Sequence, residues 1–445
     1  MKKSNLFWAM AAGVLAFSAC SKTESGIVPE NDGAAQQIVL QVANGGDLTT
    51  RAGRPMYGSE AKQTIENVKL IICNDQPTKN VLYEKTITDW QTSSDLYTDG
   101  GHGREMLVEL TGDAKLQAGQ NYKVYAIGYH NASDYSNLKT AVIDITKGGT
   151  FNENVKLTLN QAAGNKIGEE IFAGSLDFTP AAEVKGFRKY IVLNRQVAGV
   201  FGYVNEIPYF RGATNLKLVA SARNTGLVLG HFANVQLPDN GGENSKNTVN
   251  YVINGETPAG DKELFNITLS DWFTAIKPDA NGFIDGSKEN WHVPAEYSAN
   301  AAFKTGSVFG GNFVIPFAKD ATPVSPKNTL ELQLTDGGGK VLRTWIVKLP
   351  ATDGQIKTPH ALYTWNGTQF DEKLQNKDEQ KLYNIVRNHL YGIGTRNEDK
   401  PVDPDKPNPD PDPTDPDEPE SLNNKQDIIL QVNDNWEVIH KMELE

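Results

Sequence analysis

Short apolar runs separated by turn residues constrain this chain more than any other feature. Early examples are Val68–Ile72, Met106–Leu110 and Tyr122–Ile127, and later ones are Leu330–Leu334 and Val341–Val347. Runs of about five to eight residues, bounded by Gly, Asn or Asp, are typical of strands in antiparallel sandwiches. No amphipathic pattern longer than about three helical turns accompanies them. The sequence therefore predicts an all-β protein.

Composition and charge exclude several classes of protein. The 445 residues include 43 Lys+Arg and 55 Asp+Glu, with a formal net charge of −12. At roughly 100–200 residues per domain, this length predicts two or three domains. A net acidic chain without a long Lys/Arg run argues against nucleic acid as a partner. The only cysteines are Cys20 and Cys73, which excludes a disulfide framework and a cysteine-rich zinc site.

The first twenty residues have the pattern of a signal peptide. Lys2 and Lys3 precede the apolar run Leu6–Phe17, and the segment ends in Ser18-Ala19-Cys20. This ending resembles the lipobox of bacterial lipoproteins, in which the chain is cut before the cysteine and the thiol carries lipid. Cys20 is the predicted lipidation site, with an ordinary secretory signal as the alternative. Since no later run is apolar over roughly 20 residues, we expect membrane attachment through the lipid alone.

Residues 398–420 differ in kind from the rest of the chain. They hold ten acidic residues, two lysines and eight prolines, which give −8 of the total charge. Proline blocks regular pairing and the like charges repel, so we expect an extended, solvated linker. At about 3.1 Å per residue, the segment reaches on the order of 70 Å. The remaining chain is close to neutral.

Apolar alternation returns after this linker. Five apolar residues at even-numbered positions would lie on the same face of a strand: Ile428, Leu430, Val432, Trp436 and Val438. A lone strand can neither satisfy its backbone groups nor bury its apolar face. This C-terminal strand must therefore add to a sheet.

The two ends of the chain echo each other. Residues 36–44 read QQIVLQVAN and residues 426–434 read QDIILQVND, with five of nine positions identical at an offset of 390. Coincidence between short strands is one explanation, and a shared position in a sheet is the other. Three apolar pairs match in residue type and phase: Ile38 with Ile428, Leu40 with Leu430, and Val42 with Val432.

A shared position suggests a mechanism of assembly. A cut after Arg51 would free the first strand and leave a groove with unpaired edges, which the last strand of another molecule could fill by β-strand addition. Five apolar anchors contribute on the order of 10 kcal/mol gross. Such a contact does not close on itself, so it builds a filament. Arg54 is a second basic position, but Pro55 follows it, and trypsin-like proteases cut such bonds poorly, so Arg51–Ala52 is preferred.

Several local motifs carry a resemblance to a known family. They are the leader ending in Cys20, Arg51 after the first strand, Arg195-Gln196-Val197-Ala198, and Arg387-Asn388-His389-Leu390-Tyr391 ahead of a Pro-rich passage and a terminal strand with Trp436. With these motifs the chain resembles the FimA/Mfa-type major fimbrillins of Bacteroidetes, the subunits of type V pili. Its acidic linker is longer than that family leads us to expect.

The resemblance implies two tandem transthyretin-like antiparallel β-sandwich domains with an extended C-terminal linker and donor strand. It implies export to the outer membrane as a lipoprotein precursor, cleavage by an arginine-specific protease, and polymerisation into an adhesive cell-surface fimbria. The implied partners are other copies of the subunit and anchor or accessory subunits. The expected segments are 1–20 (signal), 21–51 (propeptide with the removable strand), 52–188 and 189–397 (sandwich domains), 398–420 (linker) and 421–445 (donor strand).

Other candidate functions find little support in the residues. His389, which we expect in a strand beside Arg387 and Asn388, has no evident catalytic partners, so we predict a structural hydrogen-bonding role and no enzyme. Gly337–Lys340 lacks phosphate-loop spacing and predicts a hairpin turn. The tryptophans 272, 291 and 365 are predicted to pack in the core or loops, with a glycan-stacking surface as the alternative. No metal or cofactor is predicted. The competing function is a lipid-retaining surface lipoprotein, either a fimbrial anchor or accessory subunit or a glycan- or protein-binding module.

Overall fold

The structure of the protein is a computed structural model. It describes residues 35–43, 65–96, 103–131, 133, 135–160, 169–181, 186–232, 235–236, 248–259, 263–273, 291, 304, 306–317, 330–348, 360–375, 385–394, 419–422, 427–429 and 431–433. Within these ranges nearly every regular element is a strand, which confirms the all-β prediction. No helix among them is long and apolar enough to cross a membrane.

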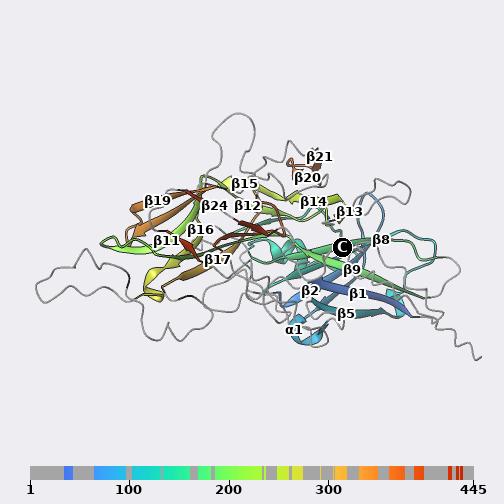
Figure 1. Ribbon diagram of the computed structural model, residues 1–445. Helices are drawn as coiled ribbons and strands as arrows, with labels where there is room; N and C mark the ends of the chain where they lie inside the picture. The colour runs from blue at the N-terminus through green and yellow to red at the C-terminus, as the bar shows by residue number, and fades with distance from the viewer. Residues whose placement is uncertain are drawn as a thin grey trace, which may run out of the picture.

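An eight-stranded sheet dominates one end of the molecule (Figure 1). Its spatial order is β3-β2-β6-β8-β9-β1-β5-β4. The strands are β1 (Gln36–Ala43), β2 (Asn67–Asn74), β3 (Val81–Ile87), β4 (Asp95–Leu96), β5 (Gly103–Leu110), β6 (Tyr122–Tyr129), β8 (Phe172–Phe178) and β9 (Phe187–Arg195). Short helical turns lie between them: α1 (Trp90–Ser93), η1 (Gly112–Ala114) and η2 (Lys139–Ile143).

The centre of this sheet is covered on both faces. Seven consecutive residues of β2 are buried, which is unusual for a strand with one wet face. Successive side chains point to opposite faces, and they enter two different cores. Leu70 and Ile72 join the cluster that contains β1, whereas Ile71 and Cys73 join a second cluster. Cys73 is buried, and its burial raises the pKa of the thiol to about 11.

Two further sheets form a sandwich at the other end of the molecule (Figure 1). One has the order β17-β10-β22-β25, and the other β16-β11-β18-β19-β24. Their strands are β10 (Ala198–Asn205), β11 (Ala213–Ala220), β16 (Glu263–Thr268), β17 (Val308–Val314), β18 (Leu330–Asp336), β19 (Val341–Lys348), β22 (Leu390–Ile393), β24 (Asp427–Ile429) and β25 (Gln431–Asn433). A 3₁₀ turn, η4 (Leu269–Asp271), follows β16.

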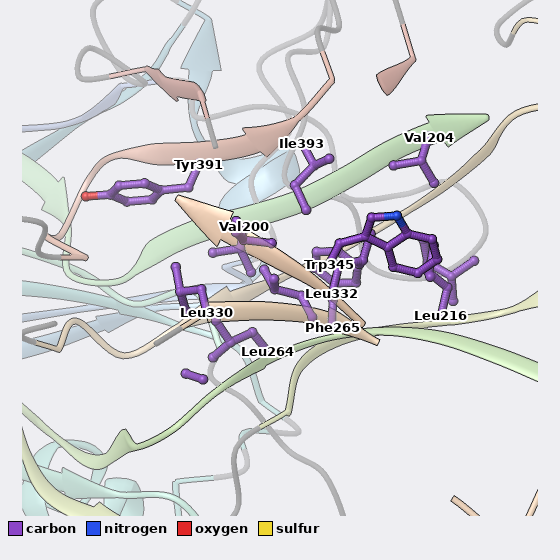
Figure 2. Close-up of a cluster of buried hydrophobic side chains, with 14 of the residues drawn as sticks. Val200, Val204, Leu216, Leu264, Phe265, Leu330, Leu332, Trp345, Tyr391 and Ile393 are labelled. Atoms are coloured by element: carbon purple, nitrogen blue, oxygen red, sulfur yellow. The ribbon is translucent and has the colours of Figure 1, made fainter. Parts of the chain in front are cut away.

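The core of this sandwich lies between the two sheets (Figure 2). Val200 and Val204 of β10 and Ile393 of β22 face Leu332 of β18 and Trp345 of β19, and all five are buried. The apolar residues of these alternating strands therefore face the core.

Smaller sheets complete the fold. One has the order β15-β12-β7, from β7 (Lys156–Thr158), β12 (Arg223–Val228) and β15 (Gly255–Ala259). Another has the order β13-β14-β20-β21, from β13 (Val235–Gln236), β14 (Thr248–Ile253), β20 (His360–Trp365) and β21 (Phe370–Gln375). Strand β12 helps to cover the inner face of the eight-stranded sheet, because Leu227 packs in the same cluster as Ile71.

Two details differ from a purely antiparallel pair of sandwiches. Most ladders are antiparallel, but β1 pairs with β9 in parallel, as β10 does with β22 and β19 with β24.

The change from one large sheet to the next occurs between β9 and β10, whereas the predicted domain boundary at residues 188 and 189 falls within β9. One cluster also contains residues from both sides of that boundary, such as Ile127 and Phe309. The domain limits stay a prediction.

Candidate functional site

The candidate site is the position that β1 occupies inside the eight-stranded sheet, between β5 and β9. We call this position the β1 slot. Strand β1 pairs with β5 in antiparallel fashion along its whole length, and with β9 in parallel from Gln36 to Val42. Leu40, for example, lies between Met106 of β5 and Ile191 of β9. A strand in this position satisfies backbone groups on both of its edges, so its removal would expose two edges at once.

The apolar face of β1 fills a pocket of the core. Ile38, Leu40 and Val42 expose at most 1% of their surface. They pack in one cluster with Trp90 of α1, Val108 and Leu110 of β5, Phe172 of β8, and Ile191 and Leu193 of β9. The predicted first strand is therefore present, and Ile38, Leu40 and Val42 are buried in one apolar cluster as expected.

Two glutamines of β1 make specific side-chain contacts. The Gln36 carboxamide donates to the Leu116 carbonyl at 3.0 Å and accepts from the Leu116 N–H at 2.7 Å. Gln36 is 7% exposed, and it lies on the same face as the three apolar side chains. On the opposite face, Gln41 donates to the Glu105 carboxylate at 3.1 Å. The slot thus presents polar partners at defined positions along the strand.

The C-terminal segment lies on the edges of the second pair of sheets. Strand β24 pairs in parallel with β19, at the end of one sheet, and β25 pairs with β22, at the end of the other. Each has three residues. Of the predicted donor-strand residues, Ile428 lies in β24 and Val432 in β25, whereas Leu430, Trp436 and Val438 lie outside the described residues.

A buried anchor precedes these edge strands. Strand β23 (Glu420–Ser421) pairs with β10, and Leu422 follows it into the sandwich core with no exposed surface. The Leu422 N–H donates to the Asn205 carbonyl at 3.1 Å. The chain is therefore fastened to its own sandwich four residues before the segment that echoes β1.

Two of the sequence motifs meet in a buried polar network. Arg195, at the end of β9, donates from Nε to Glu170 at 2.8 Å, and both side chains are fully buried. Next to it, Gln196 Oε1 accepts from the Arg387 guanidinium at 2.9 Å, and Asn254 donates to the Gln196 carbonyl at 3.1 Å. Each of these side chains makes at least one hydrogen bond within the network, which offsets part of the cost of burying it. The network links the strand beside the β1 slot to the turn that leads into β22.

His389 lies in a turn, which corrects the prediction that it belongs to a strand. The backbone of Asn388 is left-handed, with φ of 58°, and β22 begins only at Leu390. Asn tolerates this conformation better than most residues. His389 Nδ1 lies 2.8 Å from the Arg387 carbonyl, and the His389 carbonyl accepts from the Gly199 N–H. The predicted structural hydrogen-bonding role agrees with these contacts.

Within the described residues, the glycine-rich turn and the tryptophans have structural roles. Gly339 has φ of 82° in the turn from β18 to β19, and Asp336 accepts from the backbone of Gly338 and Lys340 at 2.9 Å, as expected of a hairpin. Trp272 and Trp291 pack against the sandwich core. Trp365 donates to Glu256 at 2.6 Å. No group of three or more potential metal ligands occurs within the described ranges.

Several predicted site residues lie outside the described residues. They are Cys20, Arg51, Ala52 and Arg54, together with the linker up to residue 418. Conversely, sequence reasoning missed the roles of Gln36, Gln41 and Leu422. The two glutamines did carry a signal, because both recur in the C-terminal echo, at Gln426 and Gln431.

Comparison with solved structures shows distant similarity to fimbrial proteins. A fimbrial assembly protein from Parabacteroides distasonis is 11% identical, with a TM-score of 0.32 over 79% of this chain and 98% of the other. The fimbrial anchor protein Mfa2 from Porphyromonas gingivalis is 10% identical, with a TM-score of 0.33 over 79% and 99% of the two chains. The tip fimbrial protein Mfa3 from the same organism is 11% identical, with a TM-score of 0.31 over 77% and 98%.

No family model and no curated protein matches the chain.

Proposed function

We propose that the chain is a structural subunit of a cell-surface fimbria that polymerises by C-terminal donor-strand exchange and supports adhesion. The observation that carries the proposal is the β1 slot. It holds an internal strand with a fully buried apolar face, and the sequence of that strand returns near the C-terminus in the same phase. In the proposed fibre, the C-terminal strand of one copy occupies the slot that β1 has left in the next copy.

Maturation follows from this role. Cys20 carries the lipid that takes the precursor to the outer membrane, and an arginine-specific protease then cuts between Arg51 and Ala52. Strand β1 ends at Ala43 and β2 begins at Asn67, so a cut at residue 51 lies on the connection between them. It separates β1 covalently from every other strand of its sheet. Residues 21–51 then leave as a propeptide.

Apolar burial favours the incoming strand over β1. The three anchors of β1 contribute roughly 1.5–3 kcal/mol each when fully buried. The C-terminal strand carries the same three residue types in the same phase, so these contributions nearly cancel on exchange. It adds two further apolar residues of the same parity, Trp436 and Val438. At the offset of 390 these two residues extend the strand beyond the end of β1, so any apolar surface that they bury there adds to the driving force for exchange.

The present position of the C-terminal segment is compatible with its departure. Strands β24 and β25 are three-residue edge strands, each paired on one side. In the β1 slot the same segment would pair on both sides along about the length of β1. The gain in backbone pairing favours the slot, because an edge strand leaves half of its groups to solvent. Since donor and slot are different surfaces, the contact is heterologous and extends into a filament.

A truncation tests the proposal. A chain that ends at Asn424 keeps β23 and the buried Leu422 but lacks the segment that echoes β1. After cleavage by an arginine-specific protease, we expect this chain to stay folded and monomeric while the full chain forms fibres. Fibre formation by the truncated chain would contradict donor-strand exchange. Retention of the acylated Cys20 in the mature protein would instead favour a lipid-retaining anchor, accessory or ligand-binding lipoprotein.

A further inference from the structure

The contact between Gln36 and Leu116 places a polar requirement at one end of the β1 slot. The carboxamide uses both its N–H and its carbonyl oxygen on the main chain of a single residue. Leu116 lies in the connection after η1, at the end of the slot where β1 begins, and it is 7% exposed. A buried N–H and C=O pair that loses its partners is costly. Any strand that fills the slot must therefore supply a group of this shape here.

The C-terminal echo supplies that group. Five positions are identical between residues 36–44 and 426–434. Three of them are the buried anchors of β1, and the other two are Gln36 and Gln41, whose side chains contact Leu116 and Glu105. The differing positions include Gln37 with Asp427 and Ala43 with Asn433. The two segments thus share Gln36, Gln41 and the three anchors on the Gln36 face, whereas the buried Val39 on the opposite face corresponds to Ile429.

Apolar alternation alone does not define the register of an incoming strand. A slip of one residue turns the apolar face outward and is strongly disfavoured. A slip of two residues keeps the apolar parity, because Ile428, Leu430 and Val432 would simply occupy neighbouring pockets. The same slip moves Gln426 away from Leu116 and brings either Ile428 or Asn424 to its place. Isoleucine has no polar group for Leu116, and asparagine is shorter by one methylene.

We infer that Gln426 of a second copy is a register-determining residue, which takes the place of Gln36 and binds the main chain of Leu116. Gln431 takes the place of Gln41 opposite Glu105. This inference rests on the proposed function and deepens it, since it states which part of the donor strand selects its position in the slot. The apolar anchors supply affinity, and the glutamine selects one register among those that the anchors allow.

Intersubunit cross-linking tests the inference with the full chain. In β1 the partner of Val39 on β5 is Leu107, which is 47% exposed. Ile429 is the counterpart of Val39, so Leu107→Cys should form a disulfide with Ile429→Cys of the next copy. Slips of two residues would instead pair Leu107→Cys with Asp427→Cys or Gln431→Cys. Cys20→Ser serves as the background, and Cys73 is buried.

With Gln426 intact, we expect the disulfide at position 429 and little at 427 or 431. Gln426→Ala should spread the disulfides to the slipped positions and speed strand release by about tenfold or more, as expected for the loss of two hydrogen bonds. Gln426→Glu should do the same at nearly unchanged size, because it sets an oxygen against the Leu116 carbonyl. Asn433→Ala is the matched control, since β1 carries alanine at the equivalent position. The melting temperature of each monomer checks its fold.

The outcomes separate this inference from the proposed function. Disulfides confined to position 429 in Gln426→Ala, with unchanged release, would overturn the role of Gln426 while leaving strand exchange intact. The absence of intersubunit disulfides at all three positions in the chain with Gln426 would contradict strand exchange itself.

Discussion

The indole N–H of Trp345 donates to the Leu422 carbonyl at 3.3 Å, inside the core of the second pair of sheets. This contact joins the middle of β19 to a residue that lies four positions before the C-terminal echo of β1. The acidic linker therefore ends at a buried anchor, and the part of the chain that can leave without opening the core begins after Leu422. Donor reach in the proposed fibre is set by this anchor as well as by the linker.

Replacement of the anchor tests its contribution. Leu422→Ala should lower the free energy of unfolding by about 2–5 kcal/mol, because it leaves a cavity beneath Trp345. Leu82→Ala is the control, since Leu82 is 37% exposed, and it should change stability by only about 0.5 kcal/mol. Chemical denaturation of the two purified variants measures both values. Equal stabilities would show that Leu422 does not hold the segment.

Matched substitutions in the two echoing strands should act at different stages. Leu40→Ala should destabilise the uncleaved precursor by about 2–5 kcal/mol, because Leu40 is fully buried there, and it should leave assembled fibres unaffected. Leu430→Ala should weaken the fibres by a similar amount. Thermal melting of the precursor and dissociation of the fibres in denaturant measure the two effects. Fibres that Leu40→Ala weakens as much as Leu430→Ala would still contain β1.

Acid should destabilise the protein through His231. Burial, and secondly the charge of Arg387, lowers the pKa of His231 to about 3 from its usual 6.5. Between these values the unfolded chain binds a proton that the folded chain excludes, so stability falls as pH drops below 6.5. The slope from this group is at most about 1.4 kcal/mol per pH unit. His231→Asn suits the positive φ of 46° and should remove that slope.

The comparison that isolates His231 is the difference between wild type and His231→Asn across pH 4–7, since carboxylates titrate in both proteins. Parallel stability curves would mean that His231 is protonated equally in the folded and unfolded chains.

Removing the charge of either Arg195 or Glu170, which form a buried ion pair, should destabilise the protein. Glu170→Gln leaves the guanidinium without a counter-charge in a site where both side chains are fully buried, which typically costs about 3–5 kcal/mol. Lys123→Gln, which breaks a half-exposed pair with Asp177, should cost about 1 kcal/mol or less. Urea unfolding of the two variants gives the comparison. A small effect of Glu170→Gln would mean that Phe172 and Phe313, whose rings face the guanidinium, stabilise the charge sufficiently.

Local alternation was enough to predict most strands and their inward faces. In β18 the apolar residues recur with the period of two that a sheet imposes, and in β1 Ile38, Leu40 and Val42 do the same, although Val39 on the opposite face is buried as well. Pairing partners were not predictable in this way. The parallel contact of β1 with β9 joins segments about 150 residues apart, and nothing local in either strand specifies it.

Single contacts were hidden for other reasons. Leu422 follows the Pro-rich linker as an isolated apolar residue, so no periodicity indicated its burial. The sequence predicts a strand at Arg387, Asn388 and His389 because these residues follow the apolar pair Ile385 and Val386, whereas an asparagine such as Asn388 is typical of left-handed backbone. The glutamines are identical in the two echoing segments, but their role depends on the contact of Gln36 with Leu116, which only the structure shows.

Mass spectrometry of the N-terminus of subunits from assembled fibres tests the central claim most directly. The account predicts subunits that begin at Ala52 and lack residues 36–43, and an Arg51→Ala chain that fails to mature unless the cut moves to Arg54. Fibres whose subunits retain residues 36–43, or begin at an acylated Cys20, would contradict it.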